Sequence, residues 1–263
     1  MNGPGQPPQR VGRRIALEVA LIDVGGTLWP NSWPIRKADA VGRRLRIRAA
    51  MPGIEPAKVE ALADDLIESS RPGDEARSIS TENLVSINSP AEVLITRCLS
   101  RTGLPAEADT IRRLRRAMSI PVSDRMKPLP GAIELLGEIH RLGMRNVVAS
   151  NTYWRDADSY REDFRLLGMA EHVDGIITSV DAGHLKPHPA VFEMAMRWAG
   201  VAADRCVVIG NREENDIEPA LALGMWTILV HPDDPMPAAT KAHAVAPDLW
   251  ACAKAVRDML ESE

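Results

Sequence analysis

The sequence predicts an α/β fold, a doubly wound parallel sheet with an inserted all-helical cap, and three observations lead to this prediction. Short apolar runs rich in β-branched residues recur along the chain without period-2 alternation, which is typical of strands covered by helices on both faces. Helical patterns separate most of these runs, which is the order expected of a parallel sheet. One long segment, residues 31–127, holds helical patterns and no strand.

Five strands are expected in the sheet. They are LEVALID (17–23), RNVVAS (145–150), DGIITS (174–179), CVVIG (206–210) and WTILV (226–230). Helical stripes of apolar residues lie at 132–142 and 191–199, and Gly143 and Gly200 follow them where a helix would end. In a sheet of this kind the ligand site lies beyond the carboxyl ends of the strands.

The segment 31–127 is too long for a structureless loop, so we expect it to form a helical cap inserted after the first strand. Its candidate helices are residues 35–50, 56–70, 89–101 and 106–118. The predicted domains are a core of residues 15–30 and 128–263, a cap of residues 31–127, and a disordered tail of residues 1–14.

Charge is divided unevenly between these parts. Residues 33–128 carry 17 lysines and arginines against 13 aspartates and glutamates, a net charge of +4, whereas the rest carries 15 against 23, a net charge of −8. A basic cap over an acidic core would suit an anionic substrate. The alternative is a set of solvated helix faces in an arginine-rich sequence, and RRLRR (112–116) is expected to be such a face.

Composition argues against several classes of protein. The 263 residues are 45% hydrophobic and 26% charged with a formal net charge of −4, which fits a soluble globular protein rather than one that binds nucleic acid through bulk charge. No apolar run is long enough to span a membrane. Three scattered cysteines without metal-binding spacing indicate a cytoplasmic protein. The sequence does not decide the oligomeric state, which could be a monomer or a homodimer.

Polar side chains are expected to gather where the strands end. They are Asp23 after the first strand, Ser150 and Asn151 at the second, Lys186 in the loop after the third, and Asn211 and Asp216 after the fourth. A carboxylate can act as a covalent nucleophile. A hydroxyl and an amide can bind the oxygens of a transferred group, and a lysine can offset the charge that develops there. A second carboxylate is a hard ligand suited to Mg²⁺.

The order and spacing of these residues resemble the haloacid dehalogenase (HAD) superfamily of phosphotransferases and hydrolases. DVGGTL (23–28) is similar to its first motif, VVASNT (147–152) to its second, the lysine of LKPHPAVFE (185–193) to its third, and VVIGNREENDIEPALALGM (207–225) to its fourth. The resemblance implies a Rossmann-like core with a C1 cap, a helical lid that selects substrate. It also implies a hydrolase that acts on a small anionic metabolite, phosphorylated by default, through a covalent aspartyl intermediate.

Residue by residue, the resemblance implies that Asp23 is the nucleophile and that Lys186 orients it. Thr27 would steady the first loop, and Ser150 with Asn151 would bind the transferred phosphoryl group. The implied cofactor is Mg²⁺. Its ligands would be Asp23, the main-chain carbonyl of Gly25 and Asp216, with Asn211 beside it as an acceptor for a metal-bound water.

Two positions depart from the superfamily pattern. Its phosphatases have an aspartate two residues after the nucleophile, which acts as general acid and then base, but here that position is Gly25. Loss of a positioned acid/base costs about 10²–10⁴ in rate. The fourth motif usually begins Gly-Asp, but here it begins Gly210-Asn211, and an amide adds no charge to a metal site. The second hypothesis is therefore a catalytically impaired protein whose fold serves binding or regulation.

A third hypothesis is dehalogenase-like attack on carbon without a metal, with Trp29 and Trp33 lining an apolar pocket. This chain also resembles phosphonoacetaldehyde hydrolase, which has a small residue at the position of Gly25. That enzyme uses a cap lysine to form a Schiff base, and the candidate lysines in this cap are Lys37 and Lys58. DVGGT also resembles the phosphate loop of sugar kinases. There a hairpin and second strand should follow, whereas LWPNSWPIRKADAV leads into a helix.

Several neighbouring residues have two interpretations. Trp154, Arg155 and Asp156 follow the second motif and would either face the pocket or pack and cap a helix. Glu213 and Glu214 are expected to be solvated rather than outer ligands of a metal.

Overall fold

A computed structural model of the protein describes residues 16–30, 40–70, 90–119, 122, 127–231 and 239–261. Its strands are β1 (Val19–Ile22), β2 (Arg145–Ser150), β3 (Gly175–Thr178), β4 (Cys206–Gly210), β5 (Trp226–Val230) and β6 (Ala244–Ala246). They form one sheet in the order β3-β2-β1-β4-β5-β6, with every pairing parallel. The chain winds outwards in one direction from β1 and then in the other from β4, so the predicted doubly wound sheet is confirmed.

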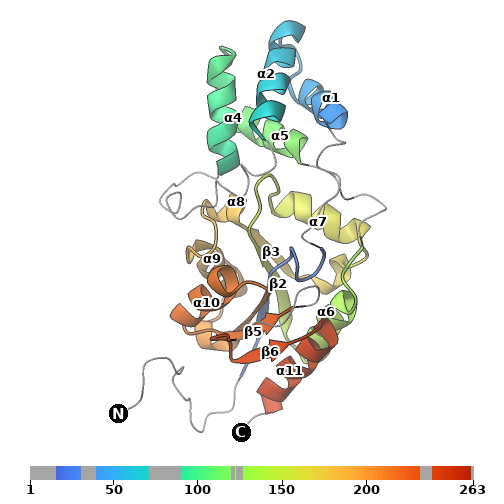
Figure 1. The fold of residues 1–263 in the computed structure, drawn as a ribbon, viewed down its shortest axis with the longest axis vertical. Helices are drawn as coiled ribbons and strands as arrows, with labels where there is room; N and C mark the ends of the chain where they lie inside the picture. The colour runs from blue at the N-terminus through green and yellow to red at the C-terminus, as the bar shows by residue number, and fades with distance from the viewer. Residues whose placement is uncertain are drawn as a thin grey trace.

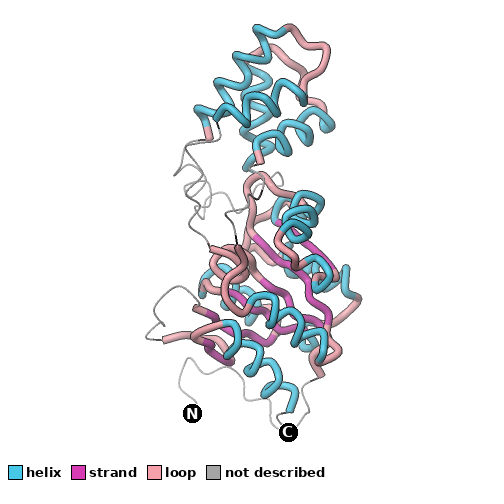
Figure 2. The backbone as a smooth tube through the Cα atoms, turned by 90° about the vertical axis from the view of Figure 1, so that its right-hand side faces the viewer, coloured by secondary structure: helices cyan, strands magenta, loops and turns pink. Residues whose placement is uncertain are grey.

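Helices cover both faces of this sheet (Figure 2). The first face carries α6 (Ala132–Arg141), α7 (Ala157–Leu166) and α11 (Leu249–Glu261), and the second carries α9 (Ala190–Ala199) and α10 (Glu218–Ala222). The short helix α8 (Ser179–Ala182) follows β3. In β1, Ala20 and Ile22 face one set of helices while Val19 and Leu21 face the other. Burial of both faces explains why the strands read as continuous apolar runs.

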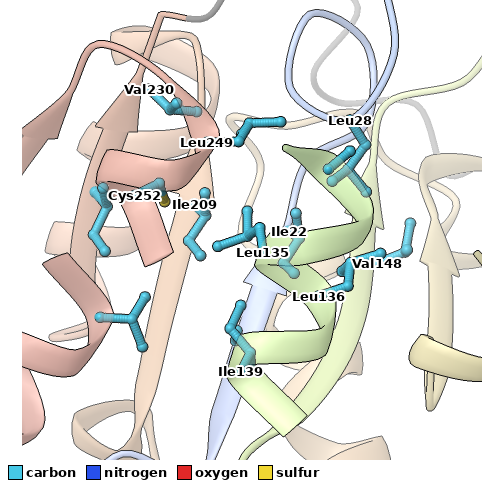
Figure 3. Close-up of a cluster of buried hydrophobic side chains, with 14 of the residues drawn as sticks. Ile22, Leu28, Leu135, Leu136, Ile139, Val148, Ile209, Val230, Leu249 and Cys252 are labelled. Atoms are coloured by element: carbon cyan, nitrogen blue, oxygen red, sulfur yellow. The ribbon is translucent and has the colours of Figure 1, made fainter. Parts of the chain in front are cut away.

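The hydrophobic core on the first face joins strands that are distant in sequence (Figure 3). Ile22 and Ile209 extend from β1 and β4 towards Leu135 of α6 and Leu249 of α11. All four side chains are fully buried. This packing holds the central strands, and therefore their carboxyl ends, in fixed positions.

The predicted strands and helices agree with the structure within a few residues. The stripe at 132–142 forms α6, and Gly143 adopts a left-handed φ of 78° just after it, as expected for a helix end. The strand β6 and the helices α8 and α11 were not anticipated. The sequence of β6 is only AVA, too short to give a strand pattern.

Of the segment predicted to be helical, the described residues 40–70 and 90–119 are mostly helical (Figure 1). Its described helices are α1 (Ala40–Ala50), α2 (Pro56–Ser69), α4 (Pro90–Arg101) and α5 (Ala108–Met118). They share a hydrophobic cluster of their own, to which α1 contributes Ile47, α2 Leu62, α4 Ile95 and α5 Leu114. The predicted tail at 1–14 and the start of the first predicted helix, residues 35–39, lie outside the described residues.

These four helices, called the cap from here on, contact the part of the chain that carries the sheet, called the core, through the segment that follows β2. Trp154 is only 6% exposed and belongs to the hydrophobic cluster of the cap. Arg115 of α5 donates to Asp156 at 2.8 Å, with 6% and 8% of the two side chains exposed. The expectation that the whole 112–116 run is solvated is therefore wrong for Arg115, because it has a buried carboxylate as partner.

Asp156 has a second role, since it caps the N-terminus of α7. Its carboxylate accepts from the Ser159 backbone N–H at 2.9 Å and from the Ser159 hydroxyl at 2.7 Å. Burial by itself raises the pKa of Asp156, but the Ser159 hydrogen bonds and the Arg115 charge outweigh burial and lower the pKa to about 2. Of the two interpretations of Trp154 and Asp156, packing and helix capping match these contacts.

Among the described helices, none combines the length and apolarity that crossing a membrane requires.

Replacing Asp156 with asparagine should lower the free energy of unfolding by about 3 kcal/mol at pH 7, because Arg115 is left buried without its counter-charge. Asparagine preserves the helix cap. A carboxylate whose pKa is lowered on folding stabilises the protein above its unfolded pKa, and this contribution is lost as pH falls towards about 2. Urea denaturation at pH 7 and pH 3 should therefore show a smaller difference between Asp156→Asn and wild type at pH 3.

The matched control is Asp158→Asn. Asp158 pairs with Arg116 at 2.7 Å, but 67% of its side chain is exposed, so the change should cost less than about 0.5 kcal/mol. Equal effects of the two substitutions would contradict the assignment of Asp156 as the stabilising contact between cap and core.

Candidate active site

The carboxyl ends of β1, β2 and β4 lie side by side at one edge of the sheet. Ile22 of β1 is in register with Val148 of β2 and Ile209 of β4. The Asp23 N–H donates to the Ile209 carbonyl at 2.9 Å, which extends this register by one step. Asp23 is 9% exposed and Ser150 is 1% exposed. The predicted gathering of polar residues at this edge is thus present.

Lys186 lies at the centre of this group, with 2% of its side chain exposed. Its ammonium donates to Asp23 Oδ1 at 2.8 Å, to Asp216 Oδ1 at 2.6 Å and to the Ala149 carbonyl at 2.8 Å. Three acceptors match the three N–H groups of an ammonium. Lys186 is therefore a fully paired buried cation that joins both predicted acidic residues.

The three charges shift the pKa values of this group. Burial by itself lowers the pKa of Lys186, but the charges of Asp216 and Asp23 outweigh it and raise that pKa above its ordinary value. Burial raises the pKa of Asp216 to about 6, with Lys186 opposing the shift and Asp23 adding to it. Lysine is thus held in its charged form between the carboxylates.

Asn151 fixes the backbone of the loop that carries Lys186. Its side-chain N–H donates to the Lys186 carbonyl at 2.9 Å, and its side-chain oxygen accepts from the Lys186 N–H at 2.7 Å. Both ends of the amide are therefore used to place the lysine. The resemblance implied that Asn151 contacts the phosphoryl group. Its role in positioning the backbone of Lys186 was not predicted.

Asp216 lies in a single π-helical turn, residues 213–217, and its position depends on Gly210. Asp216 Oδ2 accepts from the Arg212 N–H at 3.1 Å. A Cβ atom added at Gly210 would lie 2.5 Å from the Asp216 carboxyl group, closer than any real contact. The glycine of the fourth motif is therefore required for the close approach of Asp216 to the end of β4.

The loop after Asp23 is compact. Thr27 is completely buried, and its hydroxyl donates to Asp23 Oδ2 at 3.4 Å. Gly26 has a φ of 80° and donates its N–H to the Trp29 carbonyl at 2.7 Å. Among the described residues, Asp23 Oδ2 thus has one long hydrogen bond, whereas Oδ1 is bound by Lys186.

Asn211 offers an oxygen that nothing in the described part of the chain uses. It is 9% exposed, and its side-chain oxygen is buried without a hydrogen-bond partner among the described residues. Buried polar atoms normally have a partner. Like the Asp23 and Asp216 carboxylates and the Gly25 carbonyl, this oxygen is a hard donor of the kind that Mg²⁺ prefers. Within the described residues no cluster of three His, Cys, Asp or Glu side chains exists, so such a site would depend on the neutral oxygens.

Other candidate residues from the sequence lie elsewhere. Trp29 is 6% exposed, belongs to the hydrophobic core of the sheet and packs on Phe164 at 5.1 Å between ring centroids. Trp33 and Lys37 lie outside the described residues, and Lys58 is exposed on α2. Glu213 is not free in solvent, since it accepts from the Thr240 hydroxyl at 2.6 Å, whereas Glu214 is exposed as expected.

Tyr160 is a residue of the site that sequence reasoning missed. It belongs to α7, is 6% exposed, and its hydroxyl lies 3.4 Å from the Ser150 hydroxyl. The chain has only two tyrosines and two phenylalanines, and one of each occurs four residues apart at 160 and 164. Residues four apart lie on the same face of a helix, so this spacing could have indicated that Tyr160 and Phe164 face the core together.

Comparison with known proteins gives a family match over most of the chain. A profile of the haloacid dehalogenase-like hydrolases matches residues 17–224. A haloacid dehalogenase-like hydrolase domain-containing protein 3 from Xenopus laevis is 30% identical over 49% of this chain and 52% of its own length. A glyceraldehyde 3-phosphate phosphatase from Methanocaldococcus jannaschii is 30% identical over 40% of this chain and 45% of its own. The chain thus spans about half the length of these curated relatives.

Solved structures share the fold at low identity. A HAD phosphatase from Thermococcus onnurineus superposes with a TM-score of 0.56 at 15% identity, covering 91% of this chain and 98% of its own. A 2-haloacid dehalogenase from Pseudomonas syringae pv. Tomato DC3000 gives 0.56 at 19% identity, covering 92% and 99%. Since both chemistries share this fold, the side chains of the site must distinguish them.

Replacing Gly210 with alanine should destabilise the protein by about 1–3 kcal/mol, because the new methyl group must displace the Asp216 side chain or the strand end. Gly137→Ala in α6 is the matched control. Its added Cβ would meet nothing closer than His172 at 3.8 Å, so it should stabilise the helix by about 0.5–1 kcal/mol. Urea denaturation measures both, and a neutral Gly210→Ala would contradict the close approach.

Proposed function

Because the chain belongs to the haloacid dehalogenase-like hydrolase family, we propose that it hydrolyses a small phosphorylated metabolite, with Asp23 as covalent nucleophile and Mg²⁺ as cofactor. The observation that carries this proposal is the buried Lys186 ammonium between Asp23 and Asp216. A fully paired lysine at the edge of the sheet orients one carboxylate and supplies positive charge where an anionic group would be transferred.

The two oxygens of Asp23 have different roles in this proposal. Oδ1 is bound by Lys186 at 2.8 Å, which fixes the direction of the carboxylate. Within the part of the chain that the structure describes, the one hydrogen bond to Oδ2 comes from the Thr27 hydroxyl at 3.4 Å. Oδ2 is therefore the oxygen that attacks phosphorus, and Thr27 steadies the loop that carries it.

The reaction has two halves. In the first, Asp23 Oδ2 forms a bond to phosphorus while the bond from phosphorus to the leaving oxygen breaks, and that oxygen keeps the electron pair and takes a proton from water or substrate. In the second, a water oxygen attacks phosphorus and releases a proton to solvent. The bond to Asp23 Oδ2 breaks, inorganic phosphate leaves and the carboxylate is restored. The Ser150 hydroxyl binds a phosphoryl oxygen, and Lys186 offsets its charge.

The residues that would hold Mg²⁺ are Asp23, Asp216, the carbonyl of Gly25 and Asn211, the last directly or through a bound water. When bound, the ion supplies positive charge beside the transferred oxygens. The buried side-chain oxygen of Asn211, which has no hydrogen-bond partner among the described residues, supports this assignment. An amide in place of a carboxylate lowers the negative charge of the site, so we expect a weak affinity for Mg²⁺.

Two observations bear on different parts of the substrate: a relative's name supports a small phosphorylated metabolite, and Gly25 restricts the leaving group. The relative from Methanocaldococcus jannaschii is named for glyceraldehyde 3-phosphate, a small phosphorylated metabolite. Gly25 provides no side chain to protonate a leaving group. We therefore propose a substrate whose leaving oxygen needs little protonation, such as that of an acyl phosphate.

The proposed domain division is the cap at 31–127 and the core at 15–30 and 128–263. The proposed location is the cytoplasm, and the three cysteines support it because all of them are buried and free of disulfides.

The wild-type protein should release inorganic phosphate from phosphate esters and acyl phosphates in the presence of Mg²⁺, and Asp23→Asn should abolish release because an amide is a poor nucleophile. A phosphate assay over a substrate panel, with and without EDTA, measures this. Halide release that is insensitive to EDTA would instead indicate attack on carbon. Absence of turnover, with no stabilisation by vanadate, would contradict hydrolysis and favour a binding or regulatory protein.

Introducing the missing carboxylate through Gly25→Asp should raise the rate on alkyl phosphates by about 10²–10⁴, because such leaving groups need a proton. The rate on acyl phosphates should change much less, since their leaving group is already a weak base. Comparing kcat/KM on the two classes tests this. Equal gains on both would show that Gly25 does not set the leaving-group preference.

A further inference from the structure

Tyr160 is anchored to the loop of the proposed nucleophile. Its ring meets Trp29 at 5.5 Å between centroids with an interplanar angle of 71°, and Phe164 at 6.1 Å with 81°. These are edge-to-face arrangements, which are favourable between aromatic rings. Trp29 in turn accepts from the Gly26 N–H in the loop that follows Asp23. The ring position is thus fixed by packing that does not involve the hydroxyl group.

The Tyr160 hydroxyl and the Ser150 hydroxyl form an isolated buried pair. They are 3.4 Å apart, and the only other hydrogen bond of Ser150 Oγ within the described residues is a 3.5 Å contact with the Asn151 carbonyl. Hydroxyl pairs typically lie about 2.7–2.8 Å apart. Hydrogen bonds in sites without ligand are often long and shorten when substrate binds. Both hydroxyls therefore have bonding capacity left for a ligand.

We propose that Tyr160 is a positioning residue of the active site. Its hydroxyl donates to Ser150 Oγ, which leaves the Ser150 proton for an oxygen of the transferred phosphoryl group. This inference rests on the proposed function, since it assigns Ser150 to that group.

The direction of donation follows from the available partners. An anionic phosphoryl oxygen is the strongest acceptor that Ser150 can meet, so its proton goes there rather than to the Asn151 carbonyl. Ser150 Oγ then has free lone pairs, and Tyr160 is the one described side chain bonded to it. Burial, with a smaller contribution from Asp23, raises the pKa of Tyr160 to about 12. The phenol therefore keeps its proton and remains a donor at neutral pH.

The test is Tyr160→Phe, which removes the hydroxyl and keeps the ring. Titration of orthovanadate with Mg²⁺ present, followed by tryptophan fluorescence, gives the Kd of a phosphate mimic. We expect a rise in Kd of about three- to tenfold, the loss of one neutral hydrogen bond. In a Ser150→Ala background the same change should have no further effect, because the hydroxyl acts through Ser150. Tyr153→Phe, at the only other tyrosine, should change Kd less than twofold.

Two outcomes would overturn the role of Tyr160. One is an unchanged Kd in Tyr160→Phe, and the other is an equal rise with and without Ser150. If vanadate binds no variant, the wild type included, the proposed function fails, and the contact is then tested by urea denaturation of the wild type, Tyr160→Phe, Ser150→Ala and the double variant. Midpoint shifts of the two single variants that simply add in the double variant would then overturn the pairing, and non-additive shifts would support it.

Discussion

Lys186 carries a positive charge into the carboxyl edge of the sheet with 2% of its side chain exposed. Burying an unpaired ion costs several kcal/mol, so the rest of the fold must bring acceptors to it. The three acceptors come from Asp23 after β1, Ala149 in β2 and Asp216 after β4, which are neighbouring strands. The strand order and register are therefore preconditions of the site. Asn151 then fixes the backbone of Lys186 from the end of β2.

Much of this arrangement could be predicted because it depends on local patterns. The apolar runs predicted β1 to β5, and the polar residues at or after the ends of these runs predicted Asp23, Ser150 and Asp216 as site residues. The features that the sequence did not reveal depend on contacts that form only when the chain is folded. Arg115 reads as one more arginine of a polar helix face, and only the folded chain brings Asp156 to it from 41 residues away. Gly210 resembles any strand-ending glycine until the Asp216 carboxyl group is seen beside it.

The two departures from the superfamily pattern act on different steps. In the proposed reaction, Gly25 supplies no proton donor, which would restrict the leaving group and therefore the substrates. Asn211 removes a negative charge near the proposed metal site while keeping an oxygen that has no partner among the described residues. The core of the site, two carboxylates joined by one ammonium, is unaffected by either. This combination is consistent with phosphoryl transfer restricted to reactive substrates rather than with a site that has lost its chemistry.

The most direct test of Asp23 as a nucleophile is its reaction with beryllofluoride, which bonds to a carboxylate oxygen and mimics an aspartyl phosphate. Thermal denaturation with beryllofluoride and Mg²⁺, compared with Mg²⁺ alone, measures formation of this adduct. We predict a rise in Tm for the wild-type protein that requires Mg²⁺ and is absent in Asp23→Asn. An equal rise in both proteins, or none in the wild type, would contradict the assignment of Asp23.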